Sequence, residues 1–467
     1  MAIRFSHKGW VAGLCLLLML ALTLGLFQPR QVAHAKGASI TLTPNAGLPT
    51  STVLVKGAQF GNQEKVTLRF DSTPVGHAIT SSTGRFSTTI TVPQMARLGY
   101  HKVTALGQIS GLIASARFQL LPADWTAFGF GPTHSHFNPY ENQLSSSTVS
   151  HLTQAWSFPA ASDFDSSPAV VGGVMYLVAG SLFAIDAASG TQLWKLDVED
   201  GFQGSPAVAN GMVYIGGSST DLYAVDAATG TIVWTYGLDG YLGPDPVVAN
   251  GMVYMGAYGN DIPPFVALDA LTGQERWTFP IDGDYSTAAV AKGVVYVADG
   301  SGKLFALDAV TGIKRWSTKA IDGVPSVVAG VVYISGSTGY LEALDARTGT
   351  QLWKFVPKLN GIAASPAVAN GVVYINADQL YALDARTGSQ LWSFPKTGSS
   401  PAVANGVVYM GSDQLYALDA TTGTQLWSYP IDSTYSPPVV VNGMVYAADR
   451  AGKTYAFRVP TAVPPLN

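Results

Sequence analysis

Short apolar runs separated by turn residues recur along residues 158–460. Each unit begins with a small, apolar stretch such as Ser-Pro-Ala-Val at 205–208, and an Asn-Gly or related turn follows, as at Asn210-Gly211. Asn-Gly between apolar runs is typical of a β-hairpin, because both residues tolerate a positive φ. A second run ends on Tyr, a third carries Leu-x-Ala-Leu-Asp, and a turn Asp-Ala-x-Thr-Gly leads to a fourth run with Trp. The pattern predicts four strands per unit.

The clearest signature of the unit is Ala, Gly six residues later and Trp four residues after that. It recurs at intervals of 35–43 residues, and a β-rich period of this length predicts one four-stranded propeller blade per repeat. Eight first, second and third strands are present, but only seven fourth strands follow them. The run at 154–158, Gln-Ala-Trp-Ser-Phe, has the pattern of the Trp strands. We therefore expect it to complete the last blade and to close the ring, which leaves few exposed strand edges.

Conserved spacing within the repeat assigns structural roles to two residue types. A large Trp can wedge between neighbouring blades where the repeat Ala leaves room, and the turn Asp can accept hydrogen bonds from turn amides. We predict a blade-docking role for Trp156, Trp194, Trp234, Trp277, Trp316, Trp353, Trp392 and Trp427. The predicted fold is all-β, with an eight-bladed β-propeller at 158–460.

The Ala-x5-Gly-x3-Trp unit is similar to the tryptophan-docking motif of the PQQ-type (quinoprotein-like) propeller family. Residues 124–156 also resemble the lead-in segment of such proteins. The family includes quinoprotein alcohol and sugar dehydrogenases, and it includes non-enzymatic scaffolds such as the BamB-like propeller of outer-membrane assembly. The resemblance therefore implies a fold and leaves the function open.

Residues 1–35 have the pattern of a secretory signal. Arg4 and Lys8 precede an apolar run at 11–27, and Ala33-His34-Ala35 is a small-x-small cleavage site. We predict cleavage after Ala35 and export to the periplasm, the cell surface or the medium. A membrane anchor is the alternative if the signal stays uncleaved. The one Cys of the chain, Cys15, lies inside this apolar run.

Residues 36–122 form a second predicted module. Strand-like runs at 38–44, 51–57, 64–71, 85–92, 99–106 and 114–121 suggest an immunoglobulin-like (Ig-like) β-sandwich. Phrases such as Val-Lys-Gly-Ala-Gln-Phe resemble IPT/TIG-type modules. Residues 123–157 are the predicted lead-in segment and closing strand, and 461–467 form a short tail. The module carries eight Lys or Arg against two acids, which suits either contact with an anionic cell-surface polymer or a soluble spacer.

Histidine and cysteine positions limit the chemistry of the propeller. All seven His precede the propeller core, and the core has no Cys. A Ser-His-Asp or Cys-His nucleophile and a typical zinc site inside it are therefore excluded. His134 and His136 alternate along the chain and would share one face of a strand. They are either a metal-binding pair or two solvated loop residues.

Acidic residues dominate the loops from fourth to first strands and from second to third strands. Residues 123–467 carry 28 acids against 15 Lys or Arg, which argues against nucleic-acid binding. These loops either form a binding face around the channel or are simply solvated turns. The candidate partner-binding residues are Asp165, Asp200, Asp239, Asp284, Asp322, Tyr241, Tyr285 and Tyr435.

These observations favour an exported, non-catalytic scaffold that binds a protein or ligand through its acidic loop face. One alternative is a dehydrogenase that uses pyrroloquinoline quinone (PQQ) and Ca²⁺, but the family's vicinal Cys pair and long inserted loops are missing from this chain. We predict no cofactor and no catalytic, cofactor-binding or metal-binding residue. A second alternative is a structural or adhesive surface protein whose Ig-like module makes the contacts.

Overall fold

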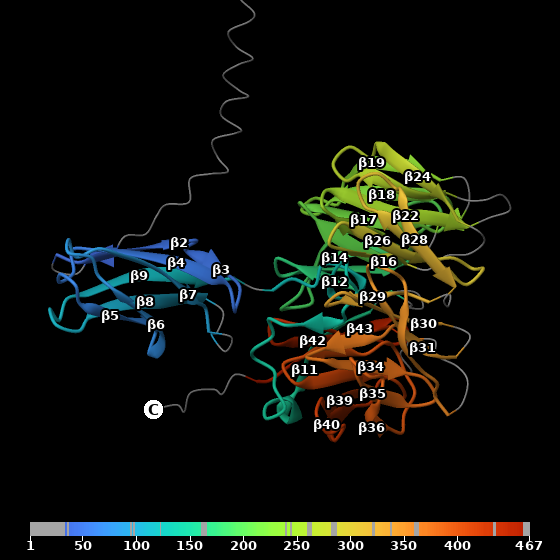
Figure 1. Ribbon diagram of the computed structural model, residues 1–467. Coiled ribbons are helices and arrows are strands. Elements are labelled where there is room, and N and C mark those ends of the chain that lie inside the picture. The colour runs from blue at the N-terminus through green and yellow to red at the C-terminus, as the bar shows by residue number, and fades with distance from the viewer. Residues whose placement is uncertain are drawn as a thin grey trace, which may run out of the picture. The chain divides into compact units, whose positions relative to one another are not determined.

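A computed structural model describes the chain in segments that belong to two compact units, residues 1–121 and 122–467 (Figure 1). The described residues are 33–34, 37–93, 96, 99–121, 123–159, 166–238, 241–242, 245–258, 264–281, 287–319, 323–336, 339–358, 364–432 and 436–460. Helical structure in these segments is limited to two 3-10 turns, η1 (Phe128–Phe130) and η2 (Val149–His151). The remaining elements are strands, so the predicted all-β class is confirmed.

Two sheets form the first unit. One has the order β1 (Ala33–His34), β2 (Ser39–Thr43), β4 (Thr52–Ala58) and β7 (Phe86–Thr91). The other has the order β3 (Ala46–Gly47), β9 (Ile113–Leu120), β8 (Gly99–Gly107), β5 (Lys65–Phe70) and β6 (Thr73–Ile79). Alternate residues of β4, β5 and β9 are buried, and both sheets contribute to one apolar core that includes Ile40, Val55, Leu68 and Phe118. The unit is a two-sheet sandwich, and its Ig-like assignment stays a prediction.

A buried carboxylate ties two loops of this unit together. Glu64 is 1% exposed, and it accepts hydrogen bonds from the backbone N–H groups of Gly61 (2.6 Å), Ile109 (2.9 Å) and Ser110 (2.8 Å). The Ser110 hydroxyl donates a further bond of 2.6 Å. Burial alone would raise the pKa of Glu64, but these bonds, led by the Ser110 hydroxyl, outweigh it and lower the pKa to about 2.

We expect Glu64→Gln to destabilise the first unit by about 1–3 kcal/mol, because an amide cannot accept all four of these bonds. The lowered pKa means that the ionised carboxylate stabilises the fold above pH 4.5, and this stabilisation is lost as the pH falls from 4.5 toward 2. Hydrogen exchange of the amides at 61 and 108–110 measures the local effect. Exchange that stays as slow in the variant as in the wild type would contradict the prediction. Trp fluorescence should not change, because residues 36–122 contain no Trp.

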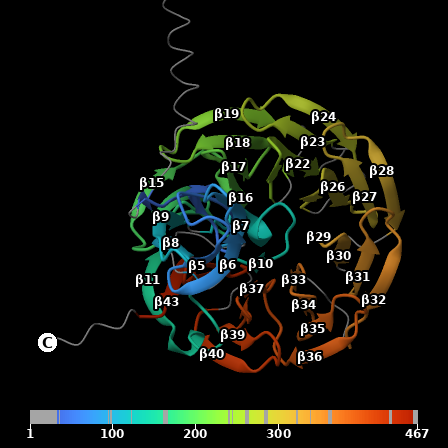
Figure 2. The ribbon, with the colours of Figure 1, turned by 60° about the vertical axis from the view of Figure 1, so that its left-hand side comes forward.

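Eight sheets form the second unit and follow one another around a ring (Figure 2). Each is one blade of a β-propeller, numbered here in chain order. Blades 1 to 4 consist of β12 (Ala169–Val171), β13 (Val174–Ala179), β14 (Ser181–Asp186) and β15 (Gln192–Leu196); β16 (Phe202–Ala209), β17 (Met212–Gly217), β18 (Asp221–Asp226) and β19 (Ile232–Gly237); β20 (Tyr241–Leu242), β21 (Val247–Ala249), β22 (Met252–Tyr258), β23 (Pro264–Asp269) and β24 (Glu275–Pro280); and β25 (Ala289–Ala291), β26 (Val294–Ala298), β27 (Lys303–Asp308) and β28 (Lys314–Lys319).

Blades 5 to 8 repeat this plan. They consist of β29 (Ser326–Val328), β30 (Val331–Ser335), β31 (Leu341–Asp345) and β32 (Gln351–Phe355); β33 (Ala367–Ala369), β34 (Val372–Asn376), β35 (Leu380–Asp384) and β36 (Gln390–Phe394); β37 (Ala402–Ala404), β38 (Val407–Gly411), β39 (Leu415–Asp419) and β40 (Gln425–Tyr429), with β10 (Phe137–Asn138) added; and β41 (Val439–Val441), β42 (Met444–Ala448), β43 (Lys453–Arg458) and β11 (Thr153–Pro159). The predicted propeller fold is confirmed.

The ring is closed by the strand that the sequence predicts. β11 pairs antiparallel with β43, so that a strand from before blade 1 becomes the fourth strand of blade 8. Arg458 has the position of the turn Asp in this blade, and β11 takes the place of the fourth strand. Blade 8 therefore combines strands that are about 300 residues apart in the chain. This pairing holds the two ends of the propeller sequence together.

Neighbouring blades are locked together by a shared acceptor. In seven junctions the backbone C=O of the Ala after the turn Asp accepts two bonds from the preceding blade, one from a Trp Nε1 at 3.0–3.2 Å and one from a Tyr hydroxyl at 2.9–3.2 Å. The donor pairs are Tyr446/Trp156, Tyr176/Trp194, Tyr214/Trp234, Tyr254/Trp277, Tyr296/Trp316, Tyr333/Trp353 and Tyr374/Trp392. At the junction of blades 7 and 8, Trp427 donates instead to the C=O of Leu152.

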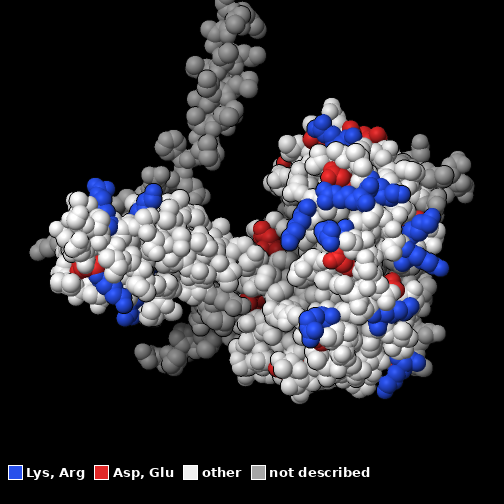
Figure 3. Space-filling model, in the orientation of Figure 1, with Lys and Arg blue, Asp and Glu red and all other residues white. Residues whose placement is uncertain are grey.

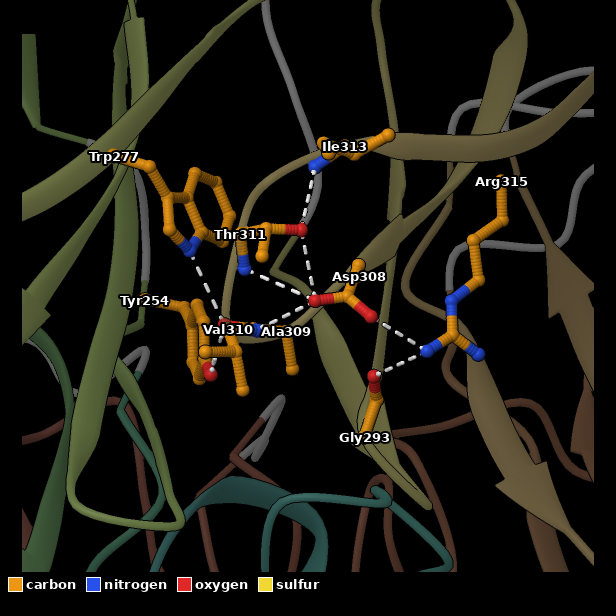
Figure 4. Close-up of polar contacts among 9 residues, drawn as sticks. All are labelled: Tyr254, Trp277, Gly293, Asp308, Ala309, Val310, Thr311, Ile313 and Arg315. Atoms are coloured by element: carbon orange, nitrogen blue, oxygen red, sulfur yellow. Dashed lines mark hydrogen bonds and ion pairs between the residues drawn. The ribbon is translucent and has the colours of Figure 1, made fainter.

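The turn that supplies this acceptor is held by its Asp (Figure 4). In blade 4, Asp308 Oδ1 accepts from the N–H groups of Val310 and Thr311 at 3.1 and 3.0 Å and from the Thr311 hydroxyl at 2.9 Å. Its Oδ2 accepts from Arg315 Nη2 at 2.7 Å. The predicted amide-bonding role of the turn Asp is confirmed. The turn Gly residues have the predicted positive φ, for example +70° at Gly312.

Candidate functional site

Each blade presents different connections at the two ends of the central channel. The turn face carries the turns between first and second strands and between third and fourth strands. The loop face carries the connections from second to third strands and from each fourth strand to the next blade. The chain order of the strands fixes this assignment. The two faces place different chemistry around the channel.

The lead-in segment, residues 123–152, passes inside the ring of blades (Figure 2), and its bonds to Asn405, Asn442 and Gly443 place it on the turn face. Its backbone follows the inner strands around the ring. Trp125 exchanges two bonds of 2.7 Å with Val170 of blade 1, and the C=O of Thr126 accepts from Val208 of blade 2 at 2.8 Å. Four more C=O groups of the segment accept from inner-strand N–H groups in blades 4 to 7. The N–H of Val290 donates to Pro132, that of Val327 to Thr133, that of Val368 to Ser135 and that of Val403 to His136. The Asn138 amide donates to the C=O of Val440 in blade 8 at 2.8 Å.

Side chains of the turn face fasten the rest of this segment. Asn442 bonds both the N–H and the C=O of Ala123, and Asn405 donates to the C=O of Leu144 at 2.8 Å. Glu141, which is 2% exposed, accepts from the N–H of Gly443 at 3.0 Å. The Asn residues of these turns therefore have two roles: they adopt a positive φ, and their side chains bind the lead-in segment. The segment is an integral part of the propeller rather than a loose connection.

His134 and His136 are buried in this segment, which corrects the interpretation of them as solvated loop residues. They are 1% and 0% exposed, and the edge of Phe128 packs against both rings at centroid distances of 5.5 and 4.9 Å. Their alternation directs both side chains to the buried side of the segment. Burial lowers the pKa of His134 to about 4 and that of His136 to about 3, because the charged imidazolium would lose its solvent. Both rings are neutral at pH 7.

A belt of hydroxyl and carboxylate groups links successive blades near the loop face. The Ser205 hydroxyl accepts from the N–H of Ser167 at 3.0 Å, and Asp245 in turn accepts from the N–H of Ser205. The other oxygen of Asp245 accepts from the Thr287 hydroxyl at 3.1 Å. Burial raises the pKa of Asp245, although the bonds from Ser205 and Thr287 oppose the shift. These residues occupy the first position of the Ser-Pro-Ala-Val stretch and hold blades 1 to 4 together at the channel wall.

Most of the predicted partner-binding residues lie outside the described residues. These are Asp165, Asp239, Asp284, Asp322, Tyr285 and Tyr435. Tyr241 is described by its backbone, which pairs with Tyr258 in blade 3. Asp200 is exposed in the turn before β16.

The described acids of the loop face fall into two groups. One group is bonded within the propeller: Asp413 accepts from Lys396 Nζ and the Tyr416 hydroxyl, and Asp449 accepts from the Tyr455 hydroxyl at 2.8 Å. Asp197, Asp221, Asp245, Asp299 and Asp378 have comparable partners. The other group consists of Glu199, Asp200 and Asp432. These three carboxylates are exposed and have no hydrogen-bond or ion-pair partner among the residues that the structure describes.

Six of the 15 Lys and Arg residues in 123–467 lie on the outer, fourth strands β15, β24, β28 and β32. Figure 3 shows several Lys and Arg side chains on the side of the second unit in view, with few acids between them. Lys314, Arg315 and Lys319 are exposed on β28, the fourth strand of blade 4. The described fourth strands carry these six cations against one acid, Glu275 on β24.

The His, Asp and Glu side chains of the described residues do not gather into a metal-binding cluster. No group of three or more His, Cys, Asp or Glu side chains within them is arranged to hold a metal ion. Asp245, a half-buried carboxylate near the loop face, already accepts from Ser205 and Thr287. Within the same residues, no helix has the length and apolar character needed to cross a membrane.

Solved structures with this architecture include an alcohol dehydrogenase, a BamB protein and a designed protein. A quinohemoprotein alcohol dehydrogenase from Comamonas testosteroni is 20% identical over 74% of this chain and 82% of its own, with a TM-score of 0.63. BamB from Moraxella catarrhalis is 20% identical over 66% of this chain and 99% of its own, with a TM-score of 0.57. The computationally designed Ika8 protein is 15% identical over 66% and 99%, with a TM-score of 0.59. At these identities the likeness establishes the fold alone.

Family profiles match the same part of the chain. The profile described as "Outer membrane protein assembly factor BamB" matches residues 178–319, 266–378 and 376–462. The profile of the β-propeller domain of glucose, ethanol and alcohol dehydrogenases matches residues 125–203. No curated protein matches the sequence. Since the BamB profile accounts for residues 178–462, more than half of the chain, the protein belongs to the family of PQQ-type, BamB-like β-propeller repeat proteins.

Proposed function

We propose that the protein is an exported, non-catalytic scaffold that captures a protein or small-ligand partner through carboxylates of its loop face. The observation that carries the proposal is the division among the described acids. Seven of them are bonded within the propeller, whereas Glu199, Asp200 and Asp432 are exposed and make no bond to described residues. Unpaired carboxylates on a rigid frame present a fixed negative surface at little ordering cost.

The blade junctions and the lead-in segment support a scaffold role. Paired Tyr and Trp donors fix seven of the junctions, and the lead-in segment bonds to inner strands of seven blades. A ring held in this way keeps its loops in constant relative positions. The signal-like residues 1–35 support export.

The alternative function is a PQQ- and Ca²⁺-dependent dehydrogenase, which the profile match at 125–203 favours. Among the described residues, no group of three or more His, Cys, Asp or Glu side chains is placed to hold a metal ion, and several acidic loops lie outside those residues. Titration of the protein with PQQ and Ca²⁺ separates the two functions. A saturable rise in unfolding temperature together with a change in quinone absorbance would support the dehydrogenase and contradict the scaffold proposal.

The charge test uses the triple variant Glu199→Gln, Asp200→Asn and Asp432→Asn. We expect proteins cross-linked to the wild type in extracts of the source cells to be recovered at least about fivefold less with the variant, because three partly exposed charge pairs contribute up to about 1 kcal/mol each. Quantitative mass spectrometry measures the recovery. A second variant with the candidate residues Asp200, Asp239, Asp284 and Asp322 changed to Asn extends the test to the whole predicted face.

The matched control is Asp124→Asn with Glu275→Gln, which removes acids from the lead-in segment and from an outer strand. Equal recovery with the wild type, the control and both loop-face variants would rule out the acidic face as the contact surface. Equal unfolding temperatures for all four proteins ensure that recovery reports binding.

A further inference from the structure

A pocket of about 520 Å³ lies on the turn face between the lead-in segment and blades 3 to 6. Its walls are mainly apolar. The lead-in segment contributes Phe130, Pro132 and Phe137, and the blades contribute Val290, Val327 and Val328. A volume of this size is within the range of small-molecule sites.

The pocket coincides with a gap in the backbone bonding of the lead-in segment. The C=O of Thr126 accepts from blade 2 and that of Pro132 accepts from blade 4, but no bond in the described residues joins the segment to Val248, the matching residue of blade 3. Residues 127–131 fold instead into the 3-10 turn η1. The segment therefore leaves the inner wall at blade 3 and returns to it at blade 4, which opens the space beside it.

Two of the turns that line the pocket depart from the repeat. The residue before the turn Gly has a positive φ in every described first-to-second strand turn, and it is Asn in five of them and Gly in one. The two exceptions are Lys292 (φ +48°) in blade 4 and Ala329 (φ +52°) in blade 5, and both line the pocket. A side chain other than Asn in this conformation costs about 1 kcal/mol. Among these described turns, residues that are unfavourable for the conformation occur only in two that line the pocket, which indicates that the pocket has a function.

The two departures give the pocket its chemistry. Ala329 has a small side chain where most of the repeats have an amide, so it leaves room at the rim. Lys292 is exposed there and makes no ion pair or hydrogen bond to other described residues. The residues that line the pocket include Thr133, Ser135 and Asn250 as polar groups, and they include no Asp or Glu. A single cation beside apolar walls complements an apolar molecule with one negative charge.

We propose that this pocket binds a small apolar molecule that carries one anionic group, with its apolar part against Phe130, Phe137 and Val328 and its anion beside Lys292. The site is at the end of the channel opposite to the loop face. It is therefore independent of the partner capture proposed above, and neutralisation of the loop-face acids should leave it unchanged.

The test uses decanoate as the probe and its uncharged amide, decanamide, as the matched compound. We expect isothermal titration to give one saturable site for decanoate and at least threefold weaker binding of decanamide. Lys292→Asn introduces the residue that most of the repeats have here. Because Asn adopts a positive φ at lower cost than Lys, the variant should be at least as stable as the wild type. It should weaken decanoate binding about three- to fivefold, as for loss of one partly exposed charge pair, and leave decanamide binding unchanged.

Two further variants separate the pocket from other surfaces. Val328→Phe fills the pocket and should abolish binding of both compounds, while Lys314→Asn on an outer strand should change neither. Absence of saturable decanoate binding to the wild type would overturn the proposal. Decanoate affinity that is the same in the wild type, Lys292→Asn and Val328→Phe would overturn it too, and equal affinities for decanoate and decanamide would overturn its anionic part.

Discussion

Gly312→Ala should lower the free energy of unfolding of the propeller by about 2–4 kcal/mol. Gly312 has a φ of +70°, and a Cβ atom added there would lie 2.6 Å from Cδ2 and 2.7 Å from Cε3 of Trp277. The conformational strain is about 1 kcal/mol, and overpacking against a fixed side chain adds about 1–3 kcal/mol. Trp277 is 8% exposed and is held by its bond to the C=O of Ala309 at 3.2 Å, so the indole cannot easily move away.

Gly251→Ala is the matched control for this substitution. Gly251 has a φ of +77°, but a Cβ atom there would have no heavy atom within 4 Å. Its loss should therefore be limited to the strain of about 1 kcal/mol. Urea unfolding followed by Trp fluorescence measures both variants. Equal losses would mean that the indole yields to the new methyl group and that the Gly is retained for its φ alone.

The blade repeat was predictable because each of its residues acts within a fixed sequence distance. Asp308 bonds amides two and three residues later, and Gly312 follows four residues after it to complete the same turn. The docking partner of Trp277 lies in the next blade, but the repeat carries that partner at a constant spacing. Periodicity therefore identifies both the local turn and the contact between blades.

The lead-in segment shows where sequence reasoning reaches its limit. Its bonds join backbone groups of residues 125–136 to inner strands of blades 1, 2 and 4 to 7, and backbone bonding leaves no mark on residue type. Polar His134 and His136 also break the apolar alternation that would have indicated a buried strand. The alternation becomes visible only when both imidazoles are counted as buried. That pattern was available in the sequence, but the polar character of His favoured a solvated loop.

The loop-face acids look alike in the sequence, but the structure divides them into bonded and unbonded groups. Asp378 and Asp413 each bond a Tyr hydroxyl three residues later, at Tyr381 and Tyr416. The repeated Asp-Gln-Leu-Tyr sequence at both sites was a signal for this internal role. Asp200 has no Tyr three residues later, because that position is Gln203. The Asp-Gln-Leu-Tyr spacing therefore identifies an internal role for these two acids, which the density of acids does not.

The buried His pair should make the propeller sensitive to mild acid, and His136→Phe should remove about half of that sensitivity. The pKa values of His134 and His136, about 4 and about 3, are below the value of 6.5 for an exposed imidazole. Between pH 6.5 and pH 4 the unfolded chain therefore binds more protons than the folded one. The stabilisation is complete above pH 6.5 and is lost progressively as the pH falls. At pH 5 each group should cost about 2 kcal/mol of unfolding free energy relative to pH 7.5.

His136→Phe isolates one of the two groups, because a phenyl ring can keep the edge-to-face contact with Phe128, whose interplanar angle with His136 is 90°. Neither nitrogen of His136 has a hydrogen-bond partner among the described residues, so the substitution removes no bond to them. Stability at pH 7.5 should change by less than about 1 kcal/mol, while at pH 5 the variant should be more stable than the wild type by about 2 kcal/mol. Urea unfolding at pH 5, 6 and 7.5 measures the difference, with His151→Phe on the exposed turn η2 as the control. If the wild type and His136→Phe lose stability in parallel as the pH falls, protons bound elsewhere account for the acid sensitivity, and the buried imidazole takes no part in it.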